Sequence, residues 1–457
     1  MDNITSNKKI FLKYLFSSIF SAIILSIYSL FDAFCVAQYE GEAGSAALGC
    51  GIPVWTLIYS LGLLCGIGGS TMMMVERGKG NLKRGNQIFT SSFILAIILC
   101  IFVWIFMWIF QKQLLILFGA KDSEVLRLIT LYTNWLKRGL PFFFFNQFLT
   151  VYVRNDNDPL RASIGVVAGG VINMILDLIF VFVAKMGING AGLATMLGQI
   201  GTILVLLSHF ITKKNQLSFV KPEHLLKDFK MVIRAGFSSF VLDVCMGIST
   251  IIFNNQIANY NTGEMLVIYQ AIFGVLINMF TLVQSIGYGV GQSSQPLLSK
   301  NVGKNDKKAI NEFFKYGIIT CIIAGIILGT SFLIFAPNLL TIFAKVEQGS
   351  DTMTIGTKVS RIYYISFFII VFNVYSTYYF NSILKPRISF IISLLRGIGF
   401  PLLFYFVLPA INFDLLWYSI ICIEGLIAII SIVSMFIFKF KPLEEKEENI
   451  LEEKVSC

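Results

Sequence analysis

Residues 162–184 read ASIGVVAGGVINMILDLIFVFVA, an apolar stretch that contains a single charged residue, Asp177. A helix of this length can cross the hydrocarbon core of a bilayer, which is roughly 30 Å thick. Comparable unbroken apolar runs recur along the chain, whereas a membrane barrel is built from short segments of alternating polarity. The stretch therefore predicts a membrane-spanning helix, and its recurrence predicts an all-helical protein embedded in a lipid bilayer.

The composition of the whole chain supports this fold class. Of its 457 residues, 56% are hydrophobic and 14% are charged, whereas soluble domains carry about 25% charged residues. We expect twelve spans. Their approximate limits are 10–37, 46–75, 88–110, 128–153, 162–184, 190–212, 231–258, 266–296, 312–336, 359–384, 388–410 and 414–438.

The basic residues are distributed unevenly along the chain, which has a formal net charge of +10. Most of the Lys and Arg residues fall at the N-terminus, in alternate connections on the same side, and near the C-terminus. This distribution marks cytoplasmic loops, so we expect a multi-pass protein with both termini in the cytoplasm and no nucleic-acid partner. The eight Cys residues show no CxxC pair, and neither a zinc site nor a disulfide framework is expected.

Two segments of the chain look like copies of each other. Residues 62–81 read GLLCGIGGSTMMMVERGKGN and residues 287–306 read GYGVGQSSQPLLSKNVGKND, so that three glycines and a lysine match at an offset of 225. A second pair of similar segments is DPLRAS at 158–163 and KPRIS at 385–389, at an offset near 226. Parallel repeats are typical of secondary transporters, whose substrate path lies between the halves. We therefore expect two parallel six-helix lobes around a central cavity. The boundaries are an N-terminal lobe at 1–212, a linker at 213–230, a C-terminal lobe at 231–438 and a charged tail at 439–457.

Acidic side chains inside the spans are the first candidates for a functional site, because a carboxylate in hydrocarbon is costly. Asp32 follows Tyr28 by one helical turn, and Asp177 follows Asn173 by one turn, so each pair shares a helix face. Thr195 lies a few residues into the next span. These oxygen atoms could enclose Na⁺, or a buried Asp near a second carboxylate could take up and release a proton. Two simpler readings stay open: Asp32 is solvated near the interface, and Asn173 only joins helices.

The second half carries different intramembrane polar groups. Its candidates for a substrate or ion site are Asp243, Gln270, Gln284, Arg396 and Glu424. The positions that repeat Asn173 and Asp177 fall near Gly399 and Leu403, which offer no ligand. We therefore expect the cation-coupling site in the N-terminal half only. Arg396 could also neutralise Asp243 or Glu424 and form a structural ion pair with it.

At these residues the chain resembles the MATE (multidrug and toxic compound extrusion) family, most closely its bacterial branch. The resemblance rests on YSLFDAFCVAQYEGEAGSAALG in span 1, GIGGSTMMMVERGKGN in span 2, VINMILDLIFVF in span 5, GINGAGLAT in span 6, GFSSFVLDVCMGISTIIFNNQI in span 7 and GQSSQPLLSKNVGKND in span 8. It implies that Asp32, Tyr28, Asn173, Asp177 and Thr195 form a cation site. Asp243 occupies a place where many members have Glu, which puts a second site in doubt.

The resemblance implies efflux of small amphipathic, cationic organic molecules by H⁺ or Na⁺ antiport. We expect a monomer without a cofactor in the bacterial cytoplasmic membrane. A flippase of a lipid-linked precursor is the alternative within the same superfamily, although flippases tend to line their cavity with Arg and only Arg396 lies deep in a span here. The spans contain no Ser/His or His-rich metal pattern, which disfavours a membrane-embedded enzyme, and a channel would not need a two-lobe repeat.

Overall fold

The computed structural model describes residues 2–120, 122–344 and 351–439, and the regular secondary structure of these segments is entirely helical. The α-helices are α1 (Asp2–Gly78), α2 (Leu82–Leu117), α3 (Ser123–Asn155), α4 (Pro159–Asp177), α5 (Gly187–Leu207), α6 (Leu225–Tyr260), α7 (Gly263–Gly303), α8 (Lys307–Ala344), α9 (Asp351–Tyr364), α10 (Phe367–Ser382), α11 (Pro386–Leu394), α12 (Phe400–Ile411) and α13 (Ser419–Ile437). The π-helical turns η1 (Leu178–Val183) and η3 (Leu395–Gly399) extend α4 and α11, and the 3₁₀ turns are η2 (Ser208–Ile211) and η4 (Phe413–Tyr418).

These helices confirm the predicted fold class. Eleven helical segments of the described chain are long and apolar enough to cross a membrane. The remaining expected span, 128–153, corresponds to α3, which is of similar length but more polar. Most helices extend several residues beyond the expected limits, and the linker is shorter than predicted because α6 already begins at Leu225. The predicted tail falls almost wholly within 440–457, outside the described residues.

A sharp bend at Gly41 divides α1 into the first two spans. Gly41 has φ 66° and ψ −144°, a combination that only glycine adopts readily. The bend lies against the start of α5, where the Glu40 carboxylate accepts a hydrogen bond from the backbone N–H of Ile188 at 3.1 Å. An acidic group is favourable at a helix N-terminus. The part of α1 before the bend, residues 2–41, is termed its first arm and carries Asp32. The bend therefore fixes this first arm against α5.

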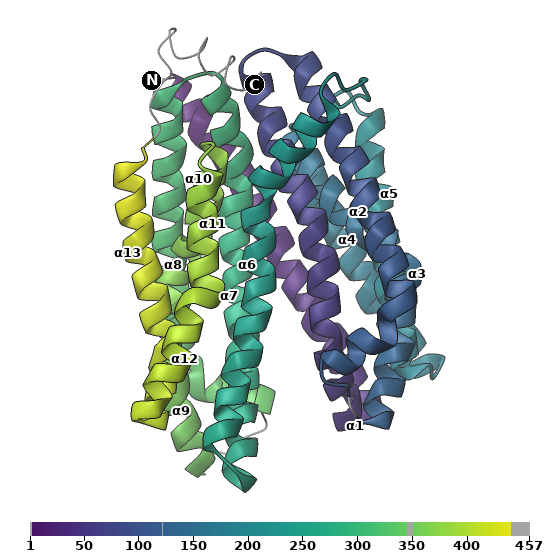
Figure 1. The fold of residues 1–457 in the computed structure, drawn as a ribbon, viewed down its shortest axis with the longest axis vertical. Helices are drawn as coiled ribbons and strands as arrows, with labels where there is room; N and C mark the ends of the chain where they lie inside the picture. The colour runs from purple at the N-terminus through teal and green to yellow at the C-terminus, as the bar shows by residue number, and fades with distance from the viewer. Residues whose placement is uncertain (1, 121, 345–350, 440–457) are drawn as a thin grey trace.

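The helices form two lobes, each with its own hydrophobic core (Figure 1). One core is built mainly from α1 to α5 and the other from α6 to α13. The first turns of α1 belong to the second core through Phe11, Tyr14 and Leu15, whereas Cys35 and Val36 further along α1 belong to the first core. The first arm of α1 therefore runs from one lobe to the other. Both ends of the described chain lie on the same side, here termed the terminal side, and the lobes diverge toward the opposite side (Figure 1).

Backbone geometry supports the internal repeat. Gly80 and Asn305, which are 225 residues apart, both have positive φ, at 86° and 57°. Pro159 and Pro386 both stand in the first turn of their helices, α4 and α11. The register between α4 and α11 is therefore 227, one residue more than the sequence suggested. This correction moves the positions that repeat Asn173 and Asp177 to Phe400 and Phe404, which are likewise apolar.

On the terminal side the two lobes touch through glycine at equivalent positions. A Cβ on Gly78 would lie 2.9 Å from the Cα of Gly303, and a Cβ on Gly303 would lie 2.9 Å from the Cα of Gly78. Nearby, the Gln295 amide of α7 donates a hydrogen bond to Thr71 of α1 at 2.6 Å. Backbones approach this closely only where side chains are absent. The terminal side is thus closed by direct contact between the two copies of the repeat.

The start of α6 is anchored to the N-terminal lobe. The Asp228 carboxylate accepts hydrogen bonds from both terminal nitrogens of Arg84 on α2 and from Ser91, the latter at 2.7 Å. Two turns further on, α6 crosses α1 where a Cβ on Gly68 would lie 2.9 Å from the Gly236 nitrogen. This crossing and the Arg84 ion pair hold the first turns of α6 against the opposite lobe.

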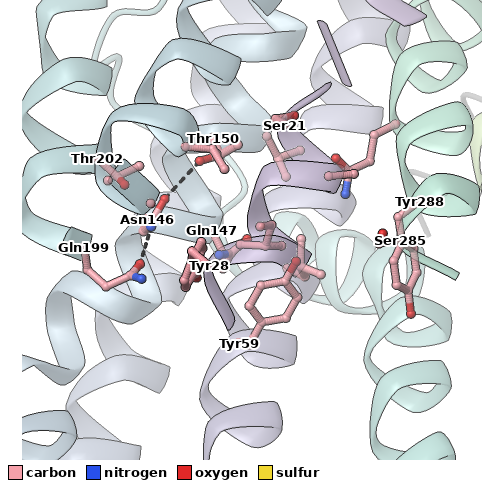
Figure 2. Close-up of a pocket in the computed structure, with 18 of the residues that line it drawn as sticks. Ser21, Tyr28, Tyr59, Asn146, Gln147, Thr150, Gln199, Thr202, Ser285 and Tyr288 are labelled. Atoms are coloured by element: carbon pink, nitrogen blue, oxygen red, sulfur yellow. Dashed lines mark hydrogen bonds between the residues drawn. The ribbon is translucent and has the colours of Figure 1, made fainter. Parts of the chain in front are cut away.

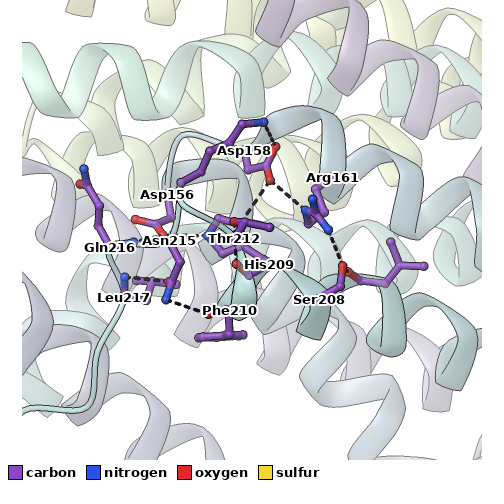
Figure 3. A network of polar contacts seen from close by, with 12 residues as sticks. Asp156, Asp158, Arg161, Ser208, His209, Phe210, Thr212, Asn215, Gln216 and Leu217 are labelled. Atoms are coloured by element: carbon purple, nitrogen blue, oxygen red, sulfur yellow. Dashed lines mark hydrogen bonds and ion pairs between the residues drawn. The ribbon is translucent and has the colours of Figure 1, made fainter.

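A buried polar network joins the ends of α1, α3 and α5 on the terminal side (Figure 3). His209 lies between two carboxylates, with Nε2 2.7 Å from Asp156 and Nδ1 3.3 Å from Asp158. Arg77 pairs with Asp156 at 2.5 Å and Lys214 pairs with Asp158 at 2.9 Å. Burial opposes the ionisation of Asp156, but the hydrogen bond from His209 and the charge of Arg77 outweigh it and hold the pKa of this carboxyl below its usual value.

Candidate functional site

The first group of predicted site residues converges in the N-terminal lobe. Asp32 on α1 is only 8% exposed, and its Oδ2 accepts a hydrogen bond from the Tyr132 hydroxyl of α3 at 3.2 Å. The same hydroxyl lies 3.4 Å from Thr195 Oγ1 on α5. Asn173 on α4 donates its side-chain amide to Thr195 at 3.3 Å. Four helices thus bring their polar side chains to one buried place.

Asp177 completes this group from the end of α4. The residue is fully buried, and its carboxylate is close enough to Asp32 for the two charges to interact. Directly after it, the π-helical turn η1 interrupts the α-helical hydrogen bonding. Such interruptions are frequent at functional sites. The interfacial solvation that the sequence left open for Asp32 does not apply, because both carboxylates are buried.

Four oxygen atoms of this group make no hydrogen bond to any described residue. They are Asp32 Oδ1, Asn173 Oδ1 and both carboxylate oxygens of Asp177. Buried polar atoms normally have a partner, and unpaired ones call for an explanation such as a bound ion. Oxygen-only donor sets suit hard cations, and a proton would satisfy a carboxylate equally well. The residues present therefore fit either of the two cations expected from the sequence, Na⁺ or H⁺.

Tyr28 lies beside this group and faces a central cavity (Figure 2). Its hydroxyl interacts with the Gln199 side chain and feels the charge of Asp32. The cavity is lined from both lobes. Its polar lining includes Ser21, Tyr28, Tyr59, Asn146, Gln147, Thr150, Arg154, Gln199, Thr202, Ser285, Tyr288 and Gln292.

The C-terminal candidates fall into separate groups. Arg396 and Glu424, each 1% exposed, form a buried ion pair with Arg396 Nη2 2.8 Å from Glu424 Oε1. Asn373 donates a further hydrogen bond to Glu424 Oε2 at 2.6 Å. Of the two partners that the sequence left open for Arg396, the structure selects Glu424. The Arg396 guanidinium therefore neutralises Glu424, and we interpret the two residues as a structural ion pair.

Asp243 belongs to a different group, next to the cavity. The Tyr288 hydroxyl donates a hydrogen bond to Asp243 at 2.5 Å and accepts one from the Gln284 amide at 2.7 Å. Gln270 lies on the same helix as Gln284 but about four turns away, at 1.5 Å per residue too far for a shared site. The five residues grouped by the sequence thus separate into the Arg396 pair, the Asp243 cluster and an isolated Gln270.

Two residues that matter for these sites escaped the sequence analysis. Tyr132 is one of 17 tyrosines and has no acidic neighbour along its helix face. Arg154 stands in the last turn of α3 beside a polar connection, where a solvent-exposed position is expected, yet it is 3% exposed and lines the cavity. Arg396, which the sequence places deep inside a span, is therefore not the only buried arginine among the described residues. Both residues become visible only when helices far apart in sequence are placed side by side.

Comparison with known proteins was made at the level of sequence and of structure. The chain is 24% identical over 333 residues to the multidrug export protein MepA of Staphylococcus saprophyticus, covering 72% of this chain and 69% of that protein. It is 22% identical to the protein of the same name from Staphylococcus aureus, where the match covers 61% of each chain.

Solved structures agree with the fold. The chain superposes with a TM-score of 0.84 and 20% identity on a multidrug resistance MATE family transporter of the MOP superfamily in an outward-facing conformation, covering 96% of this chain and 97% of that one. A MOP superfamily transporter from Pyrococcus furiosus gives a TM-score of 0.81 at 20% identity, covering 93% of this chain and 94% of that one. Because the family model MatE matches residues 17–179 and 270–406, well over half of the sequence, this chain belongs to the MatE family.

Proposed function

We propose that this protein exports small organic molecules across the bacterial cytoplasmic membrane in exchange for H⁺ or Na⁺. The observation that carries the proposal is the set of four unpartnered oxygen atoms of Asp32, Asn173 and Asp177 in the N-terminal lobe. Two buried carboxylates without a cation are unfavourable, because like charges and desolvation both oppose ionisation. A cation that enters the site relieves this cost. The N-terminal lobe therefore differs in free energy with and without a bound cation.

The position of Asp32 suggests how the cation acts on the substrate. The first arm of α1 carries Asp32 into the N-terminal lobe, while its first turns pack in the C-terminal core. Tyr28 stands one turn from Asp32 and lines the cavity. A change at Asp32 is therefore transmitted along one helix to the cavity wall and to the opposite lobe. Alternating access then follows from rocking of the two lobes between two arrangements.

The orientation in the membrane is part of the proposal. Basic residues gather on the terminal side, which we place in the cytoplasm by the positive-inside rule. The contacts of Gly78 with Gly303 then close the cavity toward the cytoplasm. If one net charge enters per cycle, a membrane potential supplies about 2.3 kcal/mol per 100 mV, which corresponds to roughly fiftyfold accumulation.

The test uses proteoliposomes that contain the full-length protein and a preset ion gradient. Addition of a transported dye should collapse the gradient, and Asp32→Asn should abolish this coupling. Asp414→Asn is the matched control, because Asp414 is an exposed carboxylate on η4 and its loss should leave coupling unchanged. Retained coupling in Asp32→Asn would remove the proposed site.

The same vesicles identify the ion. A gradient of Na⁺ at equal pH and a gradient of pH at equal Na⁺ are imposed in turn, and dye transport is followed in each. The proposal requires that at least one gradient drives transport and that Asp177→Asn reduces this drive. Transport that is independent of both gradients would contradict it.

A further inference from the structure

A second pocket, here termed the seam pocket, lies on the terminal side where the two lobes touch. Arg77 at the end of α1 and Lys300 near the end of α7 contribute its two cationic side chains. Its other lining residues are Met74, Gly80, Leu82, Asn157 and Gln216. The pocket lies beside the contact of Gly78 with Gly303, and a Cβ on Gly78 would collide with the carbonyl oxygen of Lys300. The two lobes therefore each place one cation in the same pocket.

The Arg77 guanidinium has a donor that is not used. Its side chain is only 6% exposed. Nη1 pairs with Asp156 at 2.5 Å and Nη2 donates a hydrogen bond to Asn86 at 3.2 Å, whereas Nε has no hydrogen-bond partner among the described residues. A buried polar atom without a partner calls for an explanation such as a bound ion. Because a guanidinium N–H can only donate, the missing partner is an acceptor.

Positive charge exceeds negative charge around the seam pocket. Lys300 is partly buried and forms no ion pair within the described part of the chain, and it lies close enough to Arg77 for the two charges to interact. Lys304, one turn further along, acts on Lys300 in the same sense. The Asp156 carboxylate already serves both Arg77 and His209. Like charges at such distances repel each other, and a bound anion would relieve the repulsion.

Two side-chain amides complete the polar lining of the pocket. Asn157 stands in the turn between α3 and α4 with φ 61°, and Gln216 lies in the linker after η2. The backbone N–H of Gln216 donates to Asp156 at 2.8 Å, which holds this part of the linker beside the pocket (Figure 3). Neither amide side chain makes a hydrogen bond to a described residue, so both can donate to a ligand. A guanidinium, an ammonium and two amides thus border one space.

We propose that the seam pocket binds a phosphate group, with Arg77 and Lys300 as its cationic partners and the two amides as further donors. A guanidinium matches phosphate oxygens in geometry and charge. The four oxygens of a phosphate can accept from several directions at once. Because the two cations belong to different lobes, the group bridges them only while the terminal side is closed, and its binding favours that arrangement. This site goes beyond the proposed export function, which involves neither residue.

Binding of radiolabelled inorganic phosphate to the purified full-length protein tests the site. At constant ionic strength, set with chloride, the wild type should bind one phosphate per chain in a saturable manner. Lys300→Gln should weaken this binding about tenfold, the loss expected for one charge-assisted hydrogen bond. Lys315→Gln is the matched control, since Lys315 is an exposed lysine on α8 and its loss changes the net charge equally. Absence of saturable binding, or equal affinity in Lys300→Gln, would overturn the proposal.

A variant of the other lobe tests the part played by Arg77. Arg77→Lys keeps a positive charge opposite Asp156 but lacks the planar set of donors, so the affinity for phosphate should again fall about tenfold. Thermal unfolding without phosphate reports whether each variant keeps its fold. Lys300 has no ion-pair partner to lose, so Lys300→Gln should unfold like the wild type and decides the matter if Arg77→Lys does not fold. Unchanged affinity in a folded Arg77→Lys would remove Arg77 from the site.

Soluble phosphate and a lipid headgroup are two sources of the same chemistry, and nanodiscs distinguish them. If the occupant is soluble, radiolabelled phosphate should bind equally in phosphatidylcholine and in a mixture that contains phosphatidylglycerol. If the occupant is a headgroup, phosphatidylglycerol should compete with the label in the wild type. Binding in neither membrane would contradict the site.

Distances across the terminal side test the bridge between the lobes. Spin labels at Lys83→Cys on α2 and Lys308→Cys on α8, both exposed positions, are introduced into a chain whose native cysteines are replaced. Under conditions where two distances are populated, phosphate should raise the share of the shorter one, and Lys300→Gln should abolish this response. An unchanged distribution at saturating phosphate would overturn the bridge. Neither assay uses an ion gradient, so this proposal and the export function can fail separately.

Discussion

The two lobes use their buried acids in opposite ways. In the N-terminal lobe, Asn146 donates a hydrogen bond to Gln199, and in the C-terminal lobe Asn373 donates one to Glu424 at 2.6 Å, in the same place of the repeat. Glu424 is neutralised by Arg396. The N-terminal lobe has two carboxylates, Asp32 and Asp177, and no cation beside them among the described residues. One copy therefore contains the counter-ion of its buried acid, whereas in the other copy the proposed ion coupling would supply the cation.

The packing of neighbouring helices explains why the N-terminal lobe has no arginine at the position that repeats Arg396. At the register set by Pro159 and Pro386, the position that repeats Arg396 is Gly169. A Cβ on Gly169 would lie 2.6 Å from the carbonyl oxygen of Gly198 on α5. There is no room for any side chain at this point. Close helix packing thus keeps a positively charged side chain out of this position of α4.

The test with the largest expected effect removes the Arg396 cation that neutralises Glu424 in the C-terminal lobe. Arg396→Met should destabilise the protein by about 3–5 kcal/mol, because it leaves Glu424 buried and unpaired. Thermal unfolding in detergent measures the effect. Adding Glu424→Gln to this variant should recover most of the loss, since the remaining groups are neutral. Wild-type stability of Arg396→Met would show that Glu424 is not held by this pair, and the contrast between the lobes would fail.

A second test acts on the glycine that excludes a side chain. Gly169→Ala should cost about 1–3 kcal/mol through overpacking. It should also reduce ion-coupled transport, because α4 carries Asn173 and Asp177. Gly425→Ala is the control, since a Cβ at Gly425 meets nothing within 4 Å and alanine favours a helix. If both variants keep full coupling, close packing of α4 and α5 is not what positions the site.

A third test acts on Asp156, an acid of the N-terminal lobe that already has its partners. The pKa of Asp156 is held below its usual value, so its contribution to stability is present above that usual value and is lost as the pH falls toward the lowered one. Asp156→Asn should cost about 1–3 kcal/mol at neutral pH by leaving buried partners unsatisfied. Unfolding measured from pH 7 downward should then show a flatter acid dependence than the wild type. An unchanged acid dependence would assign it to other groups.

Much of the fold and the core of the site could be predicted from the sequence. Apolar runs and the distribution of Lys and Arg are local features, and one helical turn links Asn173 to Asp177 without further information. Tyr132 and Arg154 could not be found in this way, because their roles depend on which helices lie beside α3. The requirement for glycine at position 169 likewise becomes visible only from its contact with Gly198 on α5. Spacing along one helix predicts a shared face, but packing between helices decides which faces meet.

The crossing of α6 with α1 has a mechanical consequence. α6 is fixed by Asp228 near its start, and Gly236 stands two turns further along, so about two thirds of the helix extends beyond the crossing. The arm from Gly236 to Tyr260 is roughly 36 Å long, and a tilt of about 10° around the crossing would displace its far end by about 6 Å. The pivot of such a tilt would lie near the start of α6, at Gly236. A small tilt of α6 at the glycine crossing would therefore produce a much larger displacement at its far end.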